Sequence, residues 1–148
     1  MEPQADFKDL LALFNKQRVK YLIVGAYALA FHGAPRFTGD IDILVKPCPE
    51  NAKRILLSLE AFGFGALGLT MDDFEKPGQV IQLGVPPVRV DLITSLTGVS
   101  WKEAFSGKVK DSYGGIPVHY IGRKQLVLNK RKTKRKKDLA DLEALGEK

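Results

Sequence analysis

Hydrophobic positions in the first third of the chain recur at spacings that change from helical to strand-like. Four apolar residues near the N-terminus repeat every three or four positions: Phe7, Leu10, Leu11 and Phe14. This spacing predicts an amphipathic helix over about residues 6–17. Short apolar runs at 19–24 and 41–45 predict strands, and residues 26–31 between them predict a short helix.

The two patterns continue to alternate through the rest of the chain. A helix is expected to begin at Pro49 and end at Gly63, and strands are expected at 80–83 and 88–93. The segment between Gly63 and the first of these strands is rich in glycine and gives no clear pattern. Mixed strands and helices without an internal repeat predict an α+β (mixed α/β) fold, with a small mixed sheet flanked by helices.

Two local signals mark further elements near the C-terminus. Ser100 with Glu103 forms a capping-box pattern that predicts the start of a short helix. Gly114-Gly115 separates two strand-like runs, which predicts a hairpin. Beyond it the pattern predicts a basic helical segment over residues 123–146. Its expected apolar stripe consists of three residues: Leu139, Leu142 and Leu145.

Length and composition predict a single globular domain over residues 1–148, because hydrophobic residues make up 45% and charged residues 27%. No apolar run approaches the roughly 20 residues that span a bilayer. The N-terminus is polar and acidic, and Cys48 is the single cysteine, so neither a secretory signal nor a disulfide is expected. These features predict a cytoplasmic protein without a membrane partner.

The net charge of +6 comes from one short segment. Seven of the eight residues in Lys130–Lys137 are basic, and without them 16 basic residues remain against 17 acidic ones. Such a run predicts a contact with phosphates, of a nucleotide or of tRNA or another RNA, and a solvated helix face is the alternative. Either way, we expect the run to lie outside the core, because unpaired charges are costly to bury. Asp138 and Asp141 are expected to be helix-surface acids that pair with it.

The first candidate for chemistry is the junction after the strand at 19–24. The strand ends at Gly25, and the expected helix starts at once with Ala26. Free backbone amides at a helix start, together with the helix dipole, favour an anion, and glycine lets a phosphate approach the backbone. The junction therefore predicts a phosphate site, although Gly25 in a simple tight turn is the alternative.

An acidic pair, Asp40 and Asp42, follows at the start of the strand at 41–45. Side chains two apart on a strand point the same way, so both carboxylates are expected on one face. Two adjacent anions repel unless a cation lies between them, and hard oxygen ligands suit Mg²⁺ or Mn²⁺. Arg36 and Thr38 lie just before the pair and are candidates for contacting phosphate. A solvated strand end, with Arg36 paired to a surface acid, is the alternative interpretation.

The stretch from Val24 to Val45 reads VGAYALAFHGAPRFTGDIDILV. It resembles the signature of the nucleotidyltransferase superfamily related to DNA polymerase β, in which Gly, then Gly or Ser, precede an Asp-x-Asp between hydrophobic residues. The fuller pattern is similar to the bacterial branch that includes AbiEii-type toxins and small stand-alone nucleotidyltransferases. The C-terminal stretch Asn129–Leu145 resembles the Lys, basic run and KDLxDLxxL helix that close members of this branch.

The resemblance implies a fold, a reaction and further site residues. It implies the nucleotidyltransferase palm and a third carboxylate, which VRVDLI supplies as Asp91. The implied reaction transfers a nucleoside monophosphate from a nucleoside triphosphate to an acceptor hydroxyl and releases pyrophosphate. Asp40, Asp42 and Asp91 would hold two Mg²⁺ ions, and Lys130 is a candidate for reaching the triphosphate. Asp91 as a lone exposed acid, and Lys130 as a solvated lysine, are the alternatives.

One position departs from the family pattern, since Ala26 stands where Gly or Ser is usual. Alanine keeps the backbone amide but supplies no hydroxyl for a phosphate. A second hypothesis follows, in which the chain is a catalytically silent module that binds a nucleotide, RNA or the other half of a toxin–antitoxin pair. A third is an RNA-binding protein whose acidic pair is incidental. The acceptor, whether RNA, protein or a small molecule, is not written in these residues.

Overall fold

A computed structural model describes residues 4–35, 39–85 and 88–147. Six strands form one sheet in the order β3-β4-β2-β1-β6-β5. Their bounds are β1 Tyr21–Val24, β2 Asp40–Val45, β3 Val80–Val85, β4 Val88–Ile93, β5 Val109–Tyr113 and β6 Ile116–Tyr120. β2 runs antiparallel to β1 but parallel to β4, so the sheet is mixed and the predicted α+β class is confirmed.

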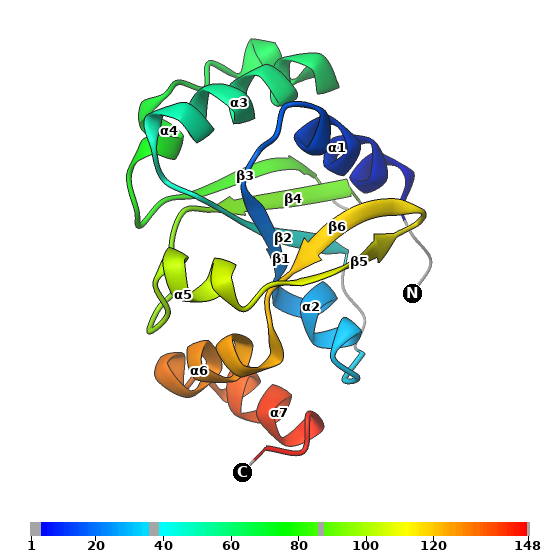
Figure 1. The fold of residues 1–148 in the computed structure, drawn as a ribbon, viewed down its shortest axis with the longest axis vertical. Coiled ribbons are helices and arrows are strands. Elements are labelled where there is room, and N and C mark those ends of the chain that lie inside the picture. The colour runs from blue at the N-terminus through cyan, green and yellow to red at the C-terminus, as the bar shows by residue number, and fades with distance from the viewer. Residues whose placement is uncertain (1–3, 36–38, 86–87, 148) are drawn as a thin grey trace.

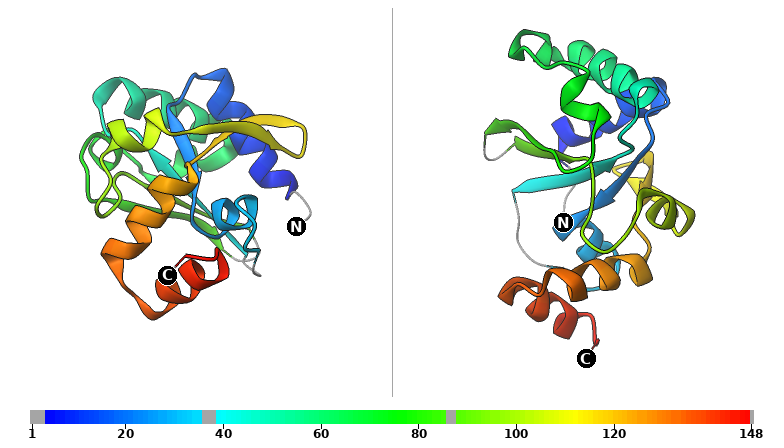
Figure 2. Two further views of the ribbon diagram at one scale, coloured as in Figure 1. Left: turned by 60° about the horizontal axis from the view of Figure 1, so that its bottom comes forward. Right: turned by 90° about the vertical axis from the view of Figure 1, so that its left-hand side faces the viewer.

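Helices lie on both sides of this sheet (Figure 1 and Figure 2). α1 Ala5–Lys16, α3 Pro49–Leu59 and α4 Asp72–Glu75 cover one side. α2 Gly25–Phe31, α6 Arg123–Thr133 and α7 Lys136–Ala144 lie on the other. The remaining helices are α5 Trp101–Ser106, η1 Glu60–Phe64 and η2 Gly65–Leu67. No helix within the described ranges is both long and apolar enough to cross a bilayer.

Strand alternation decides which side chains build the core. In β2, Ile41 and Ile43 are fully buried, and their partners across the parallel ladder, Val90 and Leu92, are at most 2% exposed. These residues pack with the buried face of α1, which consists of Phe7, Leu10, Leu11 and Phe14, as its spacing predicted. The opposite face of β2 and β4 therefore presents the intervening residues, which are polar at Asp40, Asp42 and Asp91.

Several local predictions are confirmed, and one is wrong. The Ser100 hydroxyl accepts a hydrogen bond from the Glu103 backbone amide, and the Glu103 carboxylate accepts one from the Ser100 backbone amide. The predicted capping box therefore forms at the start of α5. β5 and β6 form the predicted hairpin around Gly114-Gly115. Leu139, however, is 53% exposed, so the C-terminal apolar stripe is narrower than predicted and only Leu142 and Leu145 of its three members are buried.

Candidate active site

The acidic pair and the third carboxylate lie side by side on adjacent strands. Asp42 is the direct partner of Asp91 in the parallel ladder between β2 and β4, and Asp40 is the partner of Arg89. Neighbouring strands are about 4.8 Å apart, and paired positions present their side chains on the same face. Three carboxylates that are separated by up to 51 positions along the chain, from 40 to 91, therefore share one patch of the sheet.

Arg89 is part of this patch, although the family signature does not include it. Its guanidinium forms a two-pronged ion pair with Asp91, from Nε to Oδ1 at 3.0 Å and from Nη2 to Oδ2 at 3.0 Å. The same Nε lies 3.8 Å from Asp40 Oδ2. A signal for this role lies in VRVDLI, because residues two apart on a strand share a face and Arg89 stands two positions before Asp91.

Burial and the neighbouring carboxylates change the ionisation of Asp42. Burial, followed by the charges of Asp91 and Asp40, raises the pKa of Asp42 to about 6, and the charges of Lys137 and Arg89 only partly oppose the rise. A cluster of this kind favours a cation. Within the described ranges, no three acidic, His or Cys side chains already converge closely enough to hold one ion. Arg89 is one physical reason that the carboxylates do not converge, because its guanidinium holds both oxygens of Asp91.

Gly25 brings backbone directly against this cluster. It begins α2 with a φ of +65°, and a Cβ built on it would lie 2.9 Å from Asp42 Cγ and overlap Oδ2. Only glycine meets both demands without strain. Val24, the residue before the helix, makes no side-chain cap hydrogen bond. Its side chain therefore does not occupy the first backbone amides of α2. Ala26 is 7% exposed, so its side chain is buried rather than offered to a ligand.

The basic segment is divided into a buried part and an exposed part, which corrects two expectations. Lys130 is only 5% exposed, and its Nζ lies 2.8 Å from Asp141 Oδ2 and 3.4 Å from Asp138 Oδ1. Asp138 and Asp141 are likewise buried, so they are not helix-surface acids. The expectation that the run stays outside the core is therefore wrong for Lys130, because α7 supplies two carboxylates as partners. Its ammonium is committed to them and is not available to a phosphate.

Asp138 organises the turn between α6 and α7. Burial opposes its ionisation, but hydrogen bonds from Arg135 and Thr133, together with the charge of Lys130, hold the pKa of Asp138 well below its usual range. Its Oδ2 accepts from Arg135 Nε at 2.7 Å and from Thr133 Oγ1 at 2.6 Å. These bonds fix the start of α7, where Lys136 and Lys137 are exposed.

The start of α7 interacts electrostatically with the carboxylate cluster. The charge of Lys137 partly opposes the rise in the pKa of Asp42. The hydrogen bond with Asp138 is the main reason that the pKa of Arg135 is raised, and the charge of Asp42 adds to it. Cations in the first turn of a helix oppose the helix dipole, which costs about 0.3–1 kcal/mol each. Their presence there is explained if an anion lies between them and the sheet.

An open groove continues from the cluster along the same face of the sheet. Ile93 stands two positions after Asp91, about 7 Å along the strand, and pairs with Val80 of β3. The groove is lined by residues of the sheet, the loop after β4, and α6 with the start of α7: Val80, Ile93, Ser95, Leu96, Thr97, Asn129, Lys132, Thr133 and Arg135. Its lining combines an apolar floor with hydroxyls, an amide and two cations.

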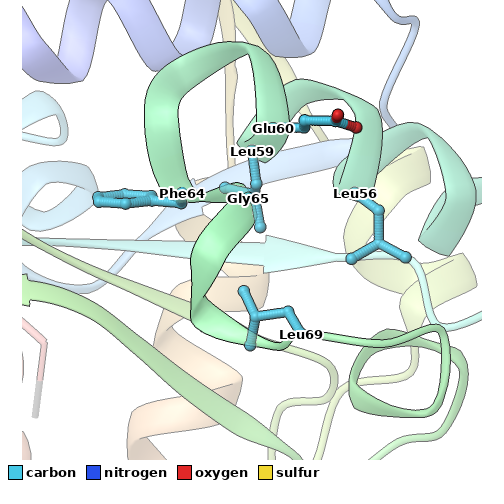
Figure 3. Close-up of a pocket in the computed structure, with 6 residues that line it drawn as sticks. All are labelled: Leu56, Leu59, Glu60, Phe64, Gly65 and Leu69. Carbon is cyan, nitrogen blue, oxygen red and sulfur yellow. The ribbon is translucent and has the colours of Figure 1, made fainter.

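A second cavity does not suit phosphate chemistry. It lies beneath η1 and η2 and is lined by Leu56, Leu59, Glu60, Phe64, Gly65 and Leu69 (Figure 3). The charged group of this lining is a carboxylate, and the segment around it is on the side of the sheet that carries α1 and α3 (Figure 1).

Two of the predicted phosphate-contacting residues, Arg36 and Thr38, lie outside the described residues.

Several solved structures resemble this fold. The antibiotic-resistance factor ANT(2'')-Ia matches with a TM-score of 0.61 at 11% identity, over 95% of this chain and 80% of that one. A Thermotoga maritima protein provisionally classed as a nucleotidyltransferase gives 0.53 at 14%, over 93% and 84%. An antigenic nucleotidyltransferase-like protein of Paracoccidioides brasiliensis gives 0.55 at 15%, over 97% and 75%.

Sequence comparison adds no relative to these structures. No protein-family model matches the chain, and no curated protein matches it. At identities of 11–15% the likeness is one of fold, and the three neighbours are nucleotidyltransferases or nucleotidyltransferase-like proteins. The chain therefore has the nucleotidyltransferase fold.

Proposed function

We propose that this chain transfers a nucleoside monophosphate from a nucleoside triphosphate to an acceptor hydroxyl, with release of pyrophosphate. The observation that carries the proposal is the pairing of Asp42 with Asp91 beside the glycine turn at Gly25. Carboxylates next to a helix start without a side-chain cap provide ligands for a divalent cation and for a phosphate in one place. A fold shared with nucleotidyltransferases supports this reaction over other phosphoryl transfers.

The donor set fits Mg²⁺ or Mn²⁺, since it consists of hard carboxylate oxygens and a carboxyl whose pKa is raised by burial and by its acidic neighbours. Asp40, Asp42 and Asp91 would hold the ions, and Asp91 would face the acceptor. When bound, such ions lower the pKa of an attacking hydroxyl and neutralise a departing pyrophosphate. The protein itself would contribute position and charge, and Asp91 would take the proton of the acceptor hydroxyl once its ion pair with Arg89 opens.

The triphosphate would lie between the starts of α2 and α7. The amides of Gly25 and Ala26 face no side-chain cap from Val24, so they can donate to the β- and γ-phosphates. Lys137, whose charge acts on Asp42, would approach from the opposite side. An exposed lysine at a helix start, where the dipole also favours an anion, thus takes the role that the sequence suggested for Lys130.

The acceptor would occupy the groove beside Asp91. Its charged lining residues are Lys132, which is exposed, and Arg135, whose guanidinium is also paired with Asp138. We therefore propose an anionic acceptor that Lys132 contacts, of which the end of a tRNA or another RNA is the simplest example. The exposed lysines of the basic segment would extend that contact.

A second candidate function rests on Ala26 and Arg89. Ala26 is buried and offers no hydroxyl. The guanidinium of Arg89 forms an ion pair with the carboxylate of Asp91. Both features are compatible with a silent member of the fold that binds a nucleotide, RNA or a partner protein, as in a toxin–antitoxin pair of the AbiEii-like branch. Loss of turnover with retained nucleotide binding is the property that separates this candidate from the enzyme.

The direct test is incubation of the chain with Mg²⁺, each of the four nucleoside triphosphates labelled at the α-phosphate, and total cellular RNA or protein. We expect transfer of label and equimolar pyrophosphate, both abolished in Asp42→Asn, because the change removes a ligand's charge with little change in volume. Asp72→Asn, an exposed acid on α4, is the matched control and should keep full activity. Nucleotide binding without transfer would favour the silent module, and an Asp42→Asn variant as active as the parent would remove the proposed role.

A further inference from the structure

The turn that follows β4 lies directly against α6. Thr97 and Gly98 form the tip of this turn, between the two residues of an isolated β-bridge. The Thr97 carbonyl oxygen accepts a hydrogen bond from Asn129 Nδ2 of α6 at 2.9 Å. Lys132 stands three positions after Asn129, so the two side chains share one face of the helix. That face of α6 therefore meets the turn and lines the groove beside it.

Gly98 contacts the base of the Lys132 side chain. Its φ is +79°, and a Cβ built on it would lie 2.9 Å from Lys132 Cβ and overlap Lys132 Cγ. Rotation of the lysine about χ1 would move Cγ, but Cβ is fixed to the backbone of α6. A larger residue at position 98 therefore has to push the turn away from α6 and also turn the lysine into another rotamer. Glycine permits the close approach that restricts the direction of the Lys132 stem.

Lys132 is the cation of the groove whose charge remains unpaired. The other cation of the lining, Arg135, places Nε 2.7 Å from Asp138 Oδ2. Lys130, on the same helix, is committed to buried carboxylates. Lys132 is exposed and forms no ion pair within the part of the chain that the structure describes. An ammonium on such a stem is a compact charge that suits a phosphate.

The surroundings of Lys132 suit a nucleotide unit. Ser95 and Thr97 are exposed hydroxyl residues of the lining. The Ser95 oxygen accepts from a backbone amide at 2.9 Å, so its own proton remains available to a phosphate oxygen. Ile93 adds an apolar surface, and Asp91 lies about 7 Å before it along β4. A chain end with its hydroxyl at Asp91 and a phosphate at the turn would follow this order of groups.

We infer that Gly98 is a positioning residue for the acceptor: its contact with the Lys132 stem holds that ammonium at the groove, where Lys132 selects an acceptor that carries a phosphate. The inference rests on the proposed function for the identity of the groove as the acceptor site. Lys132 would touch the acceptor, whereas Gly98 acts only through Lys132.

The test is fluorescence anisotropy of the full chain with a short, fluorescein-labelled single-stranded RNA over a range of salt concentrations, without nucleoside triphosphate. Lys132→Met keeps most of the stem but removes the charge, so it should flatten the plot of log K against log salt by about 0.7, the value of one phosphate contact on a single strand. Gly98→Ala should cause the same loss. Gly115→Ala, at a φ of +85° with open space around it, is the matched control for backbone strain and should keep the wild-type slope.

A double variant separates positioning from a merely structural effect. In the Lys132→Met background, Gly98→Ala should cause no further loss of RNA affinity, because its effect passes through the missing ammonium. Asn129→Ala removes the other contact with the turn without adding strain, so it should weaken RNA binding in the same way and keeps the test decisive if Gly98→Ala does not fold.

Three results would overturn the inference: no RNA binding by wild type, a Gly98→Ala slope equal to that of Gly115→Ala, or losses that add in the double variant. If label is transferred from a nucleoside triphosphate while RNA binding ignores Lys132 and Gly98, the inference fails and the proposed function stands. If RNA binding follows the expected pattern but no transfer is found, the phosphate contact stands and the proposed reaction fails.

Discussion

Asp42→Asn should stabilise the metal-free protein, even though it removes a residue that we place in the active site. In the folded chain, burial and then the charges of Asp91 and Asp40 raise the pKa of Asp42 from 3.8 to about 6. The folded state therefore binds this proton more tightly than the unfolded state, and stability falls as the pH rises from about 4 to about 6. A pKa difference of one between the two states corresponds to about 1.4 kcal/mol, so ionised Asp42 costs up to about 3 kcal/mol at pH 8. Asparagine has nearly the same volume and carries no charge.

The assay is urea unfolding of both proteins with a chelator present, at pH 8 and at pH 4.5. The variant should exceed wild type by up to about 3 kcal/mol at pH 8 and by about 1 kcal/mol at pH 4.5, where Asp42 of the folded protein is largely protonated. Added Mg²⁺ should then stabilise wild type more than the variant. Asp72→Asn, at an exposed position, should change little at either pH. A variant that is less stable than wild type at pH 8, or a difference that ignores pH, would refute the reasoning.

Three further changes test other parts of the molecule. Lys130→Met should destabilise the chain by about 3–5 kcal/mol in denaturant unfolding, because it leaves Asp138 and Asp141 buried without their cation, whereas Lys132→Met on the exposed side should cost under about 0.5 kcal/mol. Gly25→Ala should lower the free energy of unfolding by at least about 1–2 kcal/mol because of its positive φ, and it should abolish nucleotide binding because the new methyl group overlaps Asp42. Gly68→Ala, at a similar φ with open space around it, should lower stability without affecting nucleotide binding. If RNA is the acceptor, replacing exposed lysines of the basic segment by serine should flatten the plot of log K against log salt concentration, by about 0.7–0.9 in slope per lost phosphate contact. An unchanged slope would show that these lysines do not contact RNA.

Local periodicity in the sequence predicts part of the site. The phase of β2 follows from a period of two, so the shared face of Asp40 and Asp42 can be inferred from the sequence alone. The contact between Asp42 and Asp91 is implied only by family resemblance, because it depends on β4 being the parallel neighbour of β2. Strand order is set by long-range packing and is not encoded in either segment alone. The role of Arg89 is hidden for the same reason, since it emerges only when the ladder brings Asp40 opposite that residue.

The basic segment shows where a compositional argument fails. Seven cations among eight residues predict solvent exposure on average, and most of them are exposed. Lys130 is an exception because the turn between α6 and α7 folds Asp138 and Asp141 back onto it. Both acids are evident in the sequence, but their spacing along a helix predicts surface partners of the run. A buried ion cluster requires a tertiary fold-back that helical periodicity cannot reveal.

The most direct test of the central claim is a crystal structure with Mn²⁺ and a non-hydrolysable nucleoside triphosphate, with the ions located by anomalous scattering. We expect anomalous peaks bounded by the carboxylates of Asp40, Asp42 and Asp91, and a triphosphate against the amides of Gly25 and Ala26. Ions and nucleotide bound elsewhere, or a nucleotide that binds while no ion touches Asp42 or Asp91, would contradict this claim.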